Sequence, residues 1–393
     1  MTRSPTPAPA RPEPALPAPA LTAPAPRAPA LSAPTPDRLA RVVRADIAAM
    51  TAYAVPSAAG LIKLDAMENP YELPEPLRAE LAARLAAVAL NRYPAPSCQP
   101  LKAGLARAFE VPPGAALVLG NGSDELITLM SVLTARPGAC VLSPWPSFVM
   151  YEVSARLAGS RFVGVALNDD FTLDTPAMLA AIEREQPALI WIAYPNNPTG
   201  NCFDDAGIEA IVRAAPGLVV IDEAYRPFAE ASWMPRLADH PNLLVLRTVS
   251  KLGLAGLRLG YLAGSPAWIE QIDKVRPPYN INVLTEAAAL FALDHLPVLL
   301  GQAAQIRADR SLLQAQLAAL AGVQTFPSRA NFVLARLPDG ASAARGLLER
   351  GVLVKDMGKM HPSLNNCLRF TVGTPEENSA LMAALAIVLH NPS

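Results

Sequence analysis

Lys251 lies between the hydroxyl of Ser250 and the guanidinium group of Arg258, in the stretch that follows an apolar run. Leu243–Leu246 predicts a buried strand; Ser250 and Lys251 follow it, and Arg258 comes after a loop with two glycines. A lysine amine acts as a nucleophile or base only when it is neutral, and the nearby Arg258 charge favours that form. Lys251 is therefore a candidate catalytic residue, although an exposed loop lysine is the simpler interpretation of this stretch alone.

A second group of residues suits the binding of an anion. The apolar run Leu117–Leu119 predicts a strand, and Gly120 and Gly122 follow it directly before Ser123–Glu125. Glycines permit a tight turn, and the free amides and dipole at the start of a helix attract phosphate. An ordinary capped turn has the same pattern, so the glycines alone do not establish an anion site.

Two further apolar runs end in polar side chains. Asn197 stands between two prolines shortly after the predicted strand Ala188–Ala193, and the prolines hold its backbone in place. Asp222 directly follows the apolar run Gly217–Ile221, with Tyr225 three residues later. An unpaired carboxylate at a buried strand end is costly, so Asp222 needs a cationic or hydrogen-bonding partner. A turn and a helix cap are the alternative interpretations.

The elements that must position these groups alternate between strand and helix. Apolar runs predict strands at Leu117–Leu119, Cys140–Ser143, Phe162–Leu167, Ala188–Ala193, Gly217–Ile221 and Leu243–Leu246. Helical patterns lie between them, at Asp124–Leu133, Phe148–Leu157, Pro176–Glu185 and Asp204–Ala214. Such alternation is typical of an α/β fold, with a mostly parallel sheet covered by helices on both faces. Ligands bind at the carboxyl ends of such strands, where all four polar groups are expected.

The chain divides into four predicted segments. Residues 1–36 contain 12 Pro and 10 Ala and predict a disordered leader, or the result of a mis-assigned start codon. Residues 37–70 predict an N-terminal arm and part of a small domain, with a helix that Asp37 caps. Residues 71–290 predict a large cofactor-binding domain, and residues 291–393 predict a small α/β domain with strands Asn331–Arg336, Val352–Lys355 and Leu368–Val372.

Composition narrows the classes of partner. A net charge of -1 favours neither nucleic acid nor an anionic membrane, and no apolar run reaches membrane length. The four cysteines show no paired spacing and the histidines no ligand spacing, so we expect neither a disulfide framework nor a metal site. Free cysteines suit the reducing cytosol, and we expect a cytoplasmic protein.

Taken together, the four polar groups suit pyridoxal 5′-phosphate. Its aldehyde needs a lysine amine, and its ring nitrogen needs a carboxylate. Its phenolic oxygen needs hydrogen-bond donors, and its phosphate needs amides, hydroxyls and an arginine. An aromatic side chain should also stack on its ring, and Phe148, which follows the strand Cys140–Ser143, is the candidate. A plain core aromatic is the alternative interpretation of Phe148.

With these residues in place, the chain resembles the fold-type I, pyridoxal-phosphate-dependent aminotransferases over about residues 60–385. The resemblance is carried by Tyr194–Gly200, Asp222–Tyr225 and Ser250–Tyr261. Further motifs narrow it to the group acting on histidinol phosphate and its near relatives: Glu68–Tyr71, Arg92–Pro94, Gly120–Ile127 and Cys367–Gly373. The family fold has a large, mostly parallel sheet of the seven-stranded type and a smaller α/β domain.

The resemblance implies a role for each matched residue. Lys251 would bind the cofactor and move the proton, Asp222 would pair with the ring nitrogen, and Tyr225 and Asn197 would bond the phenolic oxygen. Phe148 would stack on the ring. The cofactor phosphate would be held by Ser123, Asp124, Ser250, Arg258 and, from the partner subunit of a homodimer, Tyr93. The substrate would be bound by Arg369, Asn331, Lys355 and Tyr71.

The implied reaction is transamination between L-histidinol phosphate and 2-oxoglutarate, giving imidazole-acetol phosphate and glutamate, a step of histidine biosynthesis. An aromatic amino acid aminotransferase and a threonine-phosphate decarboxylase-like lyase are the alternatives. A pyridoxal-phosphate-binding transcription regulator would need a helix-turn-helix domain in place of the Pro/Ala leader. The chain departs from common family residues at Met67 (often Asn), Phe148 (often Tyr) and Lys355 (often Arg), and the interval from Lys251 to Arg258 is one residue short.

Overall fold

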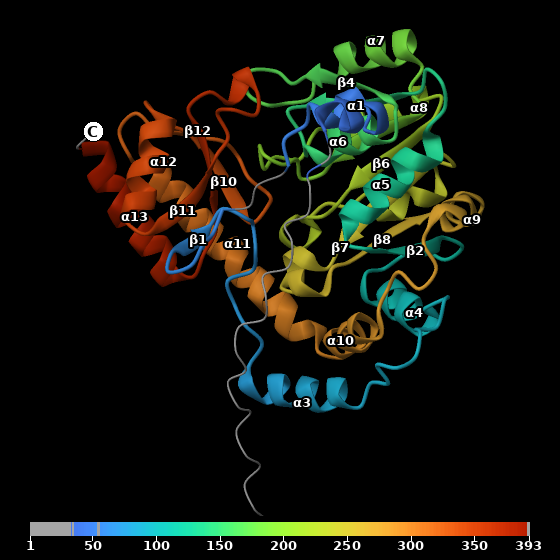
Figure 1. Cartoon of the computed structure of the whole chain (residues 1–393). Coiled ribbons are helices and arrows are strands. Elements are labelled where there is room, and N and C mark those ends of the chain that lie inside the picture. The colour runs from blue at the N-terminus through green and yellow to red at the C-terminus, as the bar shows by residue number, and fades with distance from the viewer. Residues whose placement is uncertain (1–32, 34, 53–55, 391–393) are drawn as a thin grey trace, which may run out of the picture. The chain divides into compact units, whose positions relative to one another are not determined.

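The structure is a computed structural model of the chain, and it describes residues 33, 35–52 and 56–390 (Figure 1). The chain separates into two units, Met1–Ala54 and Val55–Ser393. Most of the predicted leader lies outside the described residues. In the first unit, helices α1 (Pro36–Val42) and α2 (Ala45–Ala48) replace the single helix expected after Asp37. The prediction that Asp37 caps this helix was wrong. The Thr35 hydroxyl accepts a hydrogen bond from the Arg38 amide, and Pro36 takes the first helical position.

Seven strands of the second unit form one sheet, in the order β2-β8-β7-β6-β5-β3-β4. Their bounds are β2 (Ala116–Asn121), β3 (Cys140–Trp145), β4 (Arg161–Ala166), β5 (Leu189–Ala193), β6 (Leu218–Asp222), β7 (Leu243–Thr248) and β8 (Leu259–Gly264). All neighbouring pairs are parallel except those of β8, which runs antiparallel to β2 and to β7. The predicted fold class is confirmed, and most predicted strands lie within two residues of the observed bounds.

Helices cover both faces of this sheet, as Figure 1 shows. The bounds are α4 (Gln99–Ala108), α5 (Ser123–Thr134), α6 (Met150–Leu157), α7 (Thr175–Glu185), α8 (Asp205–Ala214), α9 (Pro266–Val275) and α10 (Val283–Asp294). Along β5, Ile190 and Ile192 join the core under α4, α7, α8 and α10, whereas Leu189, Trp191 and Ala193 join the core under α5, α6 and α9. Apolar residues at every position of β5 are therefore needed to fill both cores.

A smaller sheet has the strand order β1-β11-β12-β10-β9. Its strands are β1 (Ile62–Leu64), β9 (Gln324–Thr325), β10 (Phe332–Arg336), β11 (Val352–Asp356) and β12 (Cys367–Thr371). Strand β1 pairs in parallel with β11 and so joins the start of this unit to strands near its end. The remaining helices are α3 (Glu75–Ala86), α11 (Leu296–Ala318), α12 (Gly340–Glu349) and α13 (Pro375–His390). The domain boundaries at residues 70 and 290 stay a prediction.

Among the described helices, none by itself has both the length and the apolar character needed to cross a membrane. One pair, α10 with α11, bent by 76°, meets the length and composition criteria together. Within the same described part, no three His, Cys, Asp or Glu side chains gather as metal ligands would.

Candidate active site

A cavity of about 110 Å³ opens at the carboxyl ends of the central strands of the large sheet. Nine of the ten residues predicted to bind the cofactor line it: Ser123, Asp124, Phe148, Asn197, Asp222, Tyr225, Ser250, Lys251 and Arg258. They come from five separate stretches of the chain, which the parallel topology brings to one sheet edge. The structure thus brings together the set that was predicted, and the role of each member stays a prediction.

Lys251 lies in a 3-10 turn (η3, Ser250–Leu252) that begins directly after β7. Its Nζ donates to the Ala66 carbonyl at 3.2 Å and lies 5.7 Å from the centre of the Tyr225 ring. Burial and then the Arg369 charge lower its pKa from 10.5 to about 8, while Arg258 contributes less. The amine is therefore far closer to neutrality at physiological pH than an ordinary lysine, chiefly because of burial rather than of Arg258.

Asp222 ends β6 with its carboxyl buried at 4% exposure. One carboxyl oxygen accepts the Tyr151 hydroxyl at 2.7 Å, and the other accepts the Ala224 amide at 3.0 Å. Burial nevertheless raises its pKa from 3.8 to about 6, because neither donor carries a positive charge. Asp222 thus has two neutral hydrogen-bond donors and no cation among them.

Sequence reasoning missed Tyr151. It lies in the first turn of α6, three residues after Phe148, and its ring stacks on Trp191 at 4.9 Å between centroids. Trp191 belongs to β5, next to β6 in the sheet, so this stacking holds the Tyr151 hydroxyl toward Asp222. The spacing from Phe148 on a predicted helix was a usable signal, since residues three apart share one helix face.

The residues predicted to bind an anion lie where the start of α5 meets β8, and their role stays a prediction. The helix begins at Ser123, and Gly122 precedes it with φ of 83°. A Cβ atom on Gly260 of β8 would lie 2.7 Å from the Ser123 amide nitrogen, so glycine there keeps strand and helix close. Ser123 and Asp124 line the cavity together with Arg258, which pairs with Asp124 at 3.2 Å, and the first amides of a helix lack partners within the helix. The start of α5 and the Arg258 guanidinium group therefore lie in the same part of the cavity.

Thr248 is a second residue that sequence reasoning overlooked. It lines the cavity, and its Oγ1 lies 2.9 Å from the Ser250 hydroxyl and 2.9 Å from the Leu259 carbonyl, to which it donates. Its place two residues before Ser250, at the end of β7, was the available signal. Two hydroxyls rather than one are thus positioned beside Lys251.

Three of the four predicted substrate residues lie in or beside strands of the small sheet, outside the lining of the cavity. Arg369, buried at 6% exposure, donates to the Asn197 side chain and, at 2.9 Å, to the Asp65 carbonyl. Lys355 is its register partner on β11, and Asn331 donates to the Met67 carbonyl at 2.9 Å. Through Asn197, Arg369 therefore reaches the cavity wall.

Two predicted residues lie apart from this cluster. The Tyr71 hydroxyl donates to Asp309 at 3.2 Å, and burial together with that carboxylate raises the pKa of Tyr71 to about 12. Tyr93 is 82% exposed and stacks on Tyr279 at 4.8 Å between ring centres. Within this chain, neither ring lines the lysine cavity.

A larger cavity of about 470 Å³ lies next to the end of β7, where Thr248 lines both cavities. Glu223 and Arg247, which form a buried ion pair at 2.8 Å, help to line it, and Lys251 does not. Because successive residues of a strand point to opposite faces, Asp222 and Glu223 enter different cavities. The smaller cavity therefore holds the reactive groups.

The family model described as aminotransferase class I and II matches residues 59–385 of this chain. The chain belongs to the class I and II aminotransferases. A histidinol-phosphate aminotransferase of Cupriavidus pinatubonensis is 61% identical, over 91% of this chain and 99% of that protein. Another, of Ralstonia nicotianae, is 59% identical over 90% and 96%. The solved structure of histidinol-phosphate aminotransferase from Sinorhizobium meliloti, in complex with pyridoxal-5′-phosphate, is 27% identical, with a TM-score of 0.77, and covers 86% of this chain and 96% of its own.

An aminotransferase must hold an amine, remove a proton beside it and restrain the charge that results. In this aminotransferase, Lys251 supplies an amine of lowered pKa, Asp222 a buried carboxyl, and Arg369 a buried guanidinium group. These groups come from the turn η3 after β7, from the end of β6 and from β12, so only the folded chain brings them together.

Proposed function

We propose that this aminotransferase transfers an amino group between L-histidinol phosphate and 2-oxoglutarate, with pyridoxal 5′-phosphate bound at Lys251. The observation that carries the proposal is the Lys251 amine of lowered pKa in one cavity with the buried Asp222 carboxyl. The identity of 61% to a histidinol-phosphate aminotransferase along nearly its whole length supports the choice of substrate. The reaction is a step of histidine biosynthesis.

The residues present fit the cofactor. Asp222 lacks a cationic donor among its two hydrogen-bond partners, and a protonated ring nitrogen supplies one. The close approach at Gly260 leaves the Ser123 amide open to a phosphate, with the Thr248 and Ser250 hydroxyls and Arg258 around it. Tyr225 and Asn197, which line the cavity, would bond the phenolic oxygen, and Phe148 would stack on the ring. When bound, the cofactor serves as an electron sink for the carbon next to the amine.

Lys251 is the group that moves the proton. Its pKa of about 8 leaves a sizeable neutral fraction near neutral pH, and the Ala66 carbonyl orients its Nζ. Arg369, which contributes to this lowered pKa, would bind the carboxylate of glutamate or the phosphate of the amine substrate. An anion bound at Arg369 would cancel part of its charge and raise the pKa of Lys251. A bound anion would thus make the Lys251 amine a stronger base while lowering the fraction of it that is neutral.

Tyr151 acts as a positioning residue for Asp222. Tyr151→Phe removes a hydrogen bond that lowers the pKa of Asp222, so that pKa should rise above about 6. We expect the acid limb of the kcat/KM profile to move upward by ~1 pH unit, the effect of one hydrogen bond to a charged group. The matched control is Tyr194→Phe, because that buried hydroxyl donates to Asp205 instead. Identical profiles for Tyr151→Phe and the wild type would contradict this role.

We also propose a homodimer whose active sites are shared between subunits. Tyr93, predicted to reach the partner's cofactor phosphate, is 82% exposed, and Leu90 nearby is 70% exposed. Large exposed apolar side chains that lie close together commonly mark an interface. Such a dimer has a mass of twice the 41.5 kDa of one chain.

Mixing two inactive variants tests this sharing. A dimer of one Lys251→Ala chain and one Tyr93→Ala chain keeps one site with both residues intact. Random mixing should therefore restore about a quarter of the wild-type activity, since half of the dimers are mixed and each has one sound site. Sedimentation of the same mixture checks the mass. Full-length chains that sediment singly, or a mixture without recovered activity, would rule out the shared site.

A cytoplasmic location completes the proposal, and the four cysteines, all free in the structure, support it. Detection of the protein in the cell envelope fraction of its natural host would contradict it.

Turnover with a set of amine donors tests the substrate. The holoenzyme should transaminate histidinol phosphate with 2-oxoglutarate at a far higher kcat/KM than phenylalanine. It should release no carbon dioxide from threonine phosphate. Equal efficiency with phenylalanine would instead assign an aromatic amino acid aminotransferase, and carbon dioxide release would assign a lyase.

A further inference from the structure

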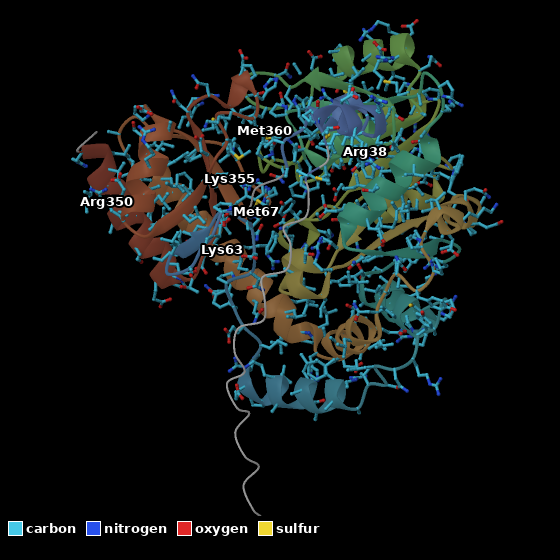
Figure 2. The ribbon with its side chains drawn as sticks, in the orientation of Figure 1. Arg38, Lys63, Met67, Arg350, Lys355 and Met360 are labelled. Carbon is cyan, nitrogen blue, oxygen red and sulfur yellow. The ribbon has the colours of Figure 1, made fainter. Side chains whose placement is uncertain are left out.

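Met67 has a backbone conformation that its side chain does not favour. Its φ is 53°, in the left-handed region where glycine and asparagine are common and an unbranched apolar residue is rare. It belongs to the connecting loop Asp65–Asn69, which follows β1 and leads into the large-sheet side of the chain. Figure 2 labels Met67 and, on β11, Lys355. A rare conformation at such a residue persists only where the surroundings enforce it.

The surroundings of Met67 do enforce it. Its amide donates to the Thr371 hydroxyl at 3.0 Å, and its carbonyl accepts the Asn331 side chain at 2.9 Å. On either side, Arg369 holds the Asp65 carbonyl at 2.9 Å and Asn69 donates to the Leu252 carbonyl at 3.3 Å. The connecting loop is thus fastened both to the small sheet and to the turn that carries Lys251. Met67 therefore occupies a set position in the active site.

Met67 lines the cavity, and it also packs against the apolar core of the small sheet. The residues proposed to hold the cofactor come from the edge of the large sheet, whereas Met67 enters from the side of Arg369 and the small sheet. Its chain neighbour Ala66 accepts the Lys251 amine at 3.2 Å. A substrate that reaches from Arg369 to the Lys251 amine would therefore lie beside residues 65–67, of which Met67 lines the cavity.

We propose that Met67 is a specificity-determining residue, whose thioether packs against the aromatic ring of the amine substrate. A polarizable sulfur makes favourable contacts with aromatic rings, and an unbranched side chain adapts to a flat heterocycle. Glutamate, the other amine in the proposed transamination, has no ring. The contact with Met67 would therefore favour the half-reaction with histidinol phosphate over that with glutamate. The inference rests on the proposed function, because it takes its ring from the imidazole of histidinol phosphate.

Two variants separate the side chain from the backbone. Met67→Asn suits a left-handed backbone but lacks the apolar thioether, and Met67→Leu keeps apolar bulk but lacks sulfur. In Met67→Asn we expect KM for histidinol phosphate to rise roughly tenfold, with kcat within about twofold of the wild type. The half-reaction with glutamate should stay within about twofold, and the unfolding midpoint of the variant should not fall. The KM of Met67→Leu for histidinol phosphate should lie between those of the wild type and Met67→Asn.

Thermal shift gives a second readout, since histidinol phosphate should raise the unfolding midpoint of the wild type more than that of Met67→Asn. Met360→Leu is the control, because Met360 packs in a separate apolar cluster away from the cavity lining. Equal losses with histidinol phosphate and glutamate, or an unchanged KM in Met67→Asn, would overturn the inference. If the wild type prefers phenylalanine to histidinol phosphate, the proposed function fails. In that case, KM for phenylalanine in the wild type and in Met67→Asn decides whether Met67 contacts the substrate ring.

Discussion

Lys251→Ala is expected to reduce transamination by at least ~10⁴-fold, because it removes both the covalent anchor of the cofactor and the base. The variant should bind pyridoxal 5′-phosphate without the absorbance of the lysine-bound form. Its fold should persist, since the Lys251 side chain donates to the Ala66 carbonyl and takes part in no buried ion pair that the structure describes. Stopped-flow absorbance and turnover with histidinol phosphate measure both effects.

Lys102→Ala is the matched control for this prediction. Burial also lowers the pKa of Lys102, but that residue lies in α4 and does not line the cavity. Its removal should leave turnover within about twofold of the wild type, the usual range for sites without a catalytic contact. Normal turnover in Lys251→Ala, or an equal loss in Lys102→Ala, would defeat the assignment of the lysine.

Asp222→Asn should lower kcat/KM by ~10³-fold, because the cofactor nitrogen loses the buried charge that keeps it protonated. Removing one partner of a buried charge pair typically costs ~3–5 kcal/mol, which corresponds to 10²–10⁴ in rate. Turnover of the reconstituted variant with histidinol phosphate measures the loss. A rate within tenfold of the wild type would contradict the role of Asp222.

The same substitution has a distinct effect on the protein without cofactor. The folded pKa of Asp222, about 6, exceeds its ordinary value of 3.8, so the folded state binds a proton that the unfolded state has released. The free energy of unfolding should therefore fall by ~3 kcal/mol between about pH 4 and 6, in proportion to the two units of difference. Asp222→Asn removes this titrating group. The difference in free energy of unfolding between the wild type and the variant should therefore change by that amount over the same pH range. A difference independent of pH would contradict the raised pKa.

Glu223→Gln offers a contrast from the next residue. Glu223 is buried against Arg247 and the Trp233 amide, and it faces the larger cavity. Its replacement should lower the free energy of unfolding by ~3 kcal/mol, because Arg247 is left buried without its charge partner. Activity of the folded fraction should survive. Asp222→Asn is expected to lose activity, whereas Glu223→Gln is expected to lose stability. Turnover and urea unfolding, measured on both variants, therefore test the two assignments together.

Local pattern was enough to predict the large sheet. Continuous apolar runs such as Ala188–Ala193 match β5 because both faces of that strand are covered, which requires no knowledge of its neighbours. The gathering of Asp222 and Lys251 followed from a general rule on parallel strand ends. The cap of α1 was missed because Asp37 and Thr35 suit the position equally by type, and backbone geometry chose between them.

Contacts between distant segments were beyond this kind of reasoning. The side chain of Arg369 reaches Asn197, 172 residues away, and also contributes to the lowered pKa of Lys251. That approach depends on how the small sheet lies against the cavity, which no local periodicity encodes. Tyr151 meets Asp222 for a similar reason, since the stacking of its ring on Trp191 requires α6 to cover β5.

By itself, the sequence determined the fold class, the aminotransferase resemblance and the set of groups at the sheet edge, because apolar periodicity and short motifs are local properties. Only the tertiary structure decided which charge acts on Lys251, which hydroxyl holds Asp222, and how Met67 enters the cavity. Those features arise from desolvation and from contacts between segments far apart in the chain, and both exist only once the sheets have packed.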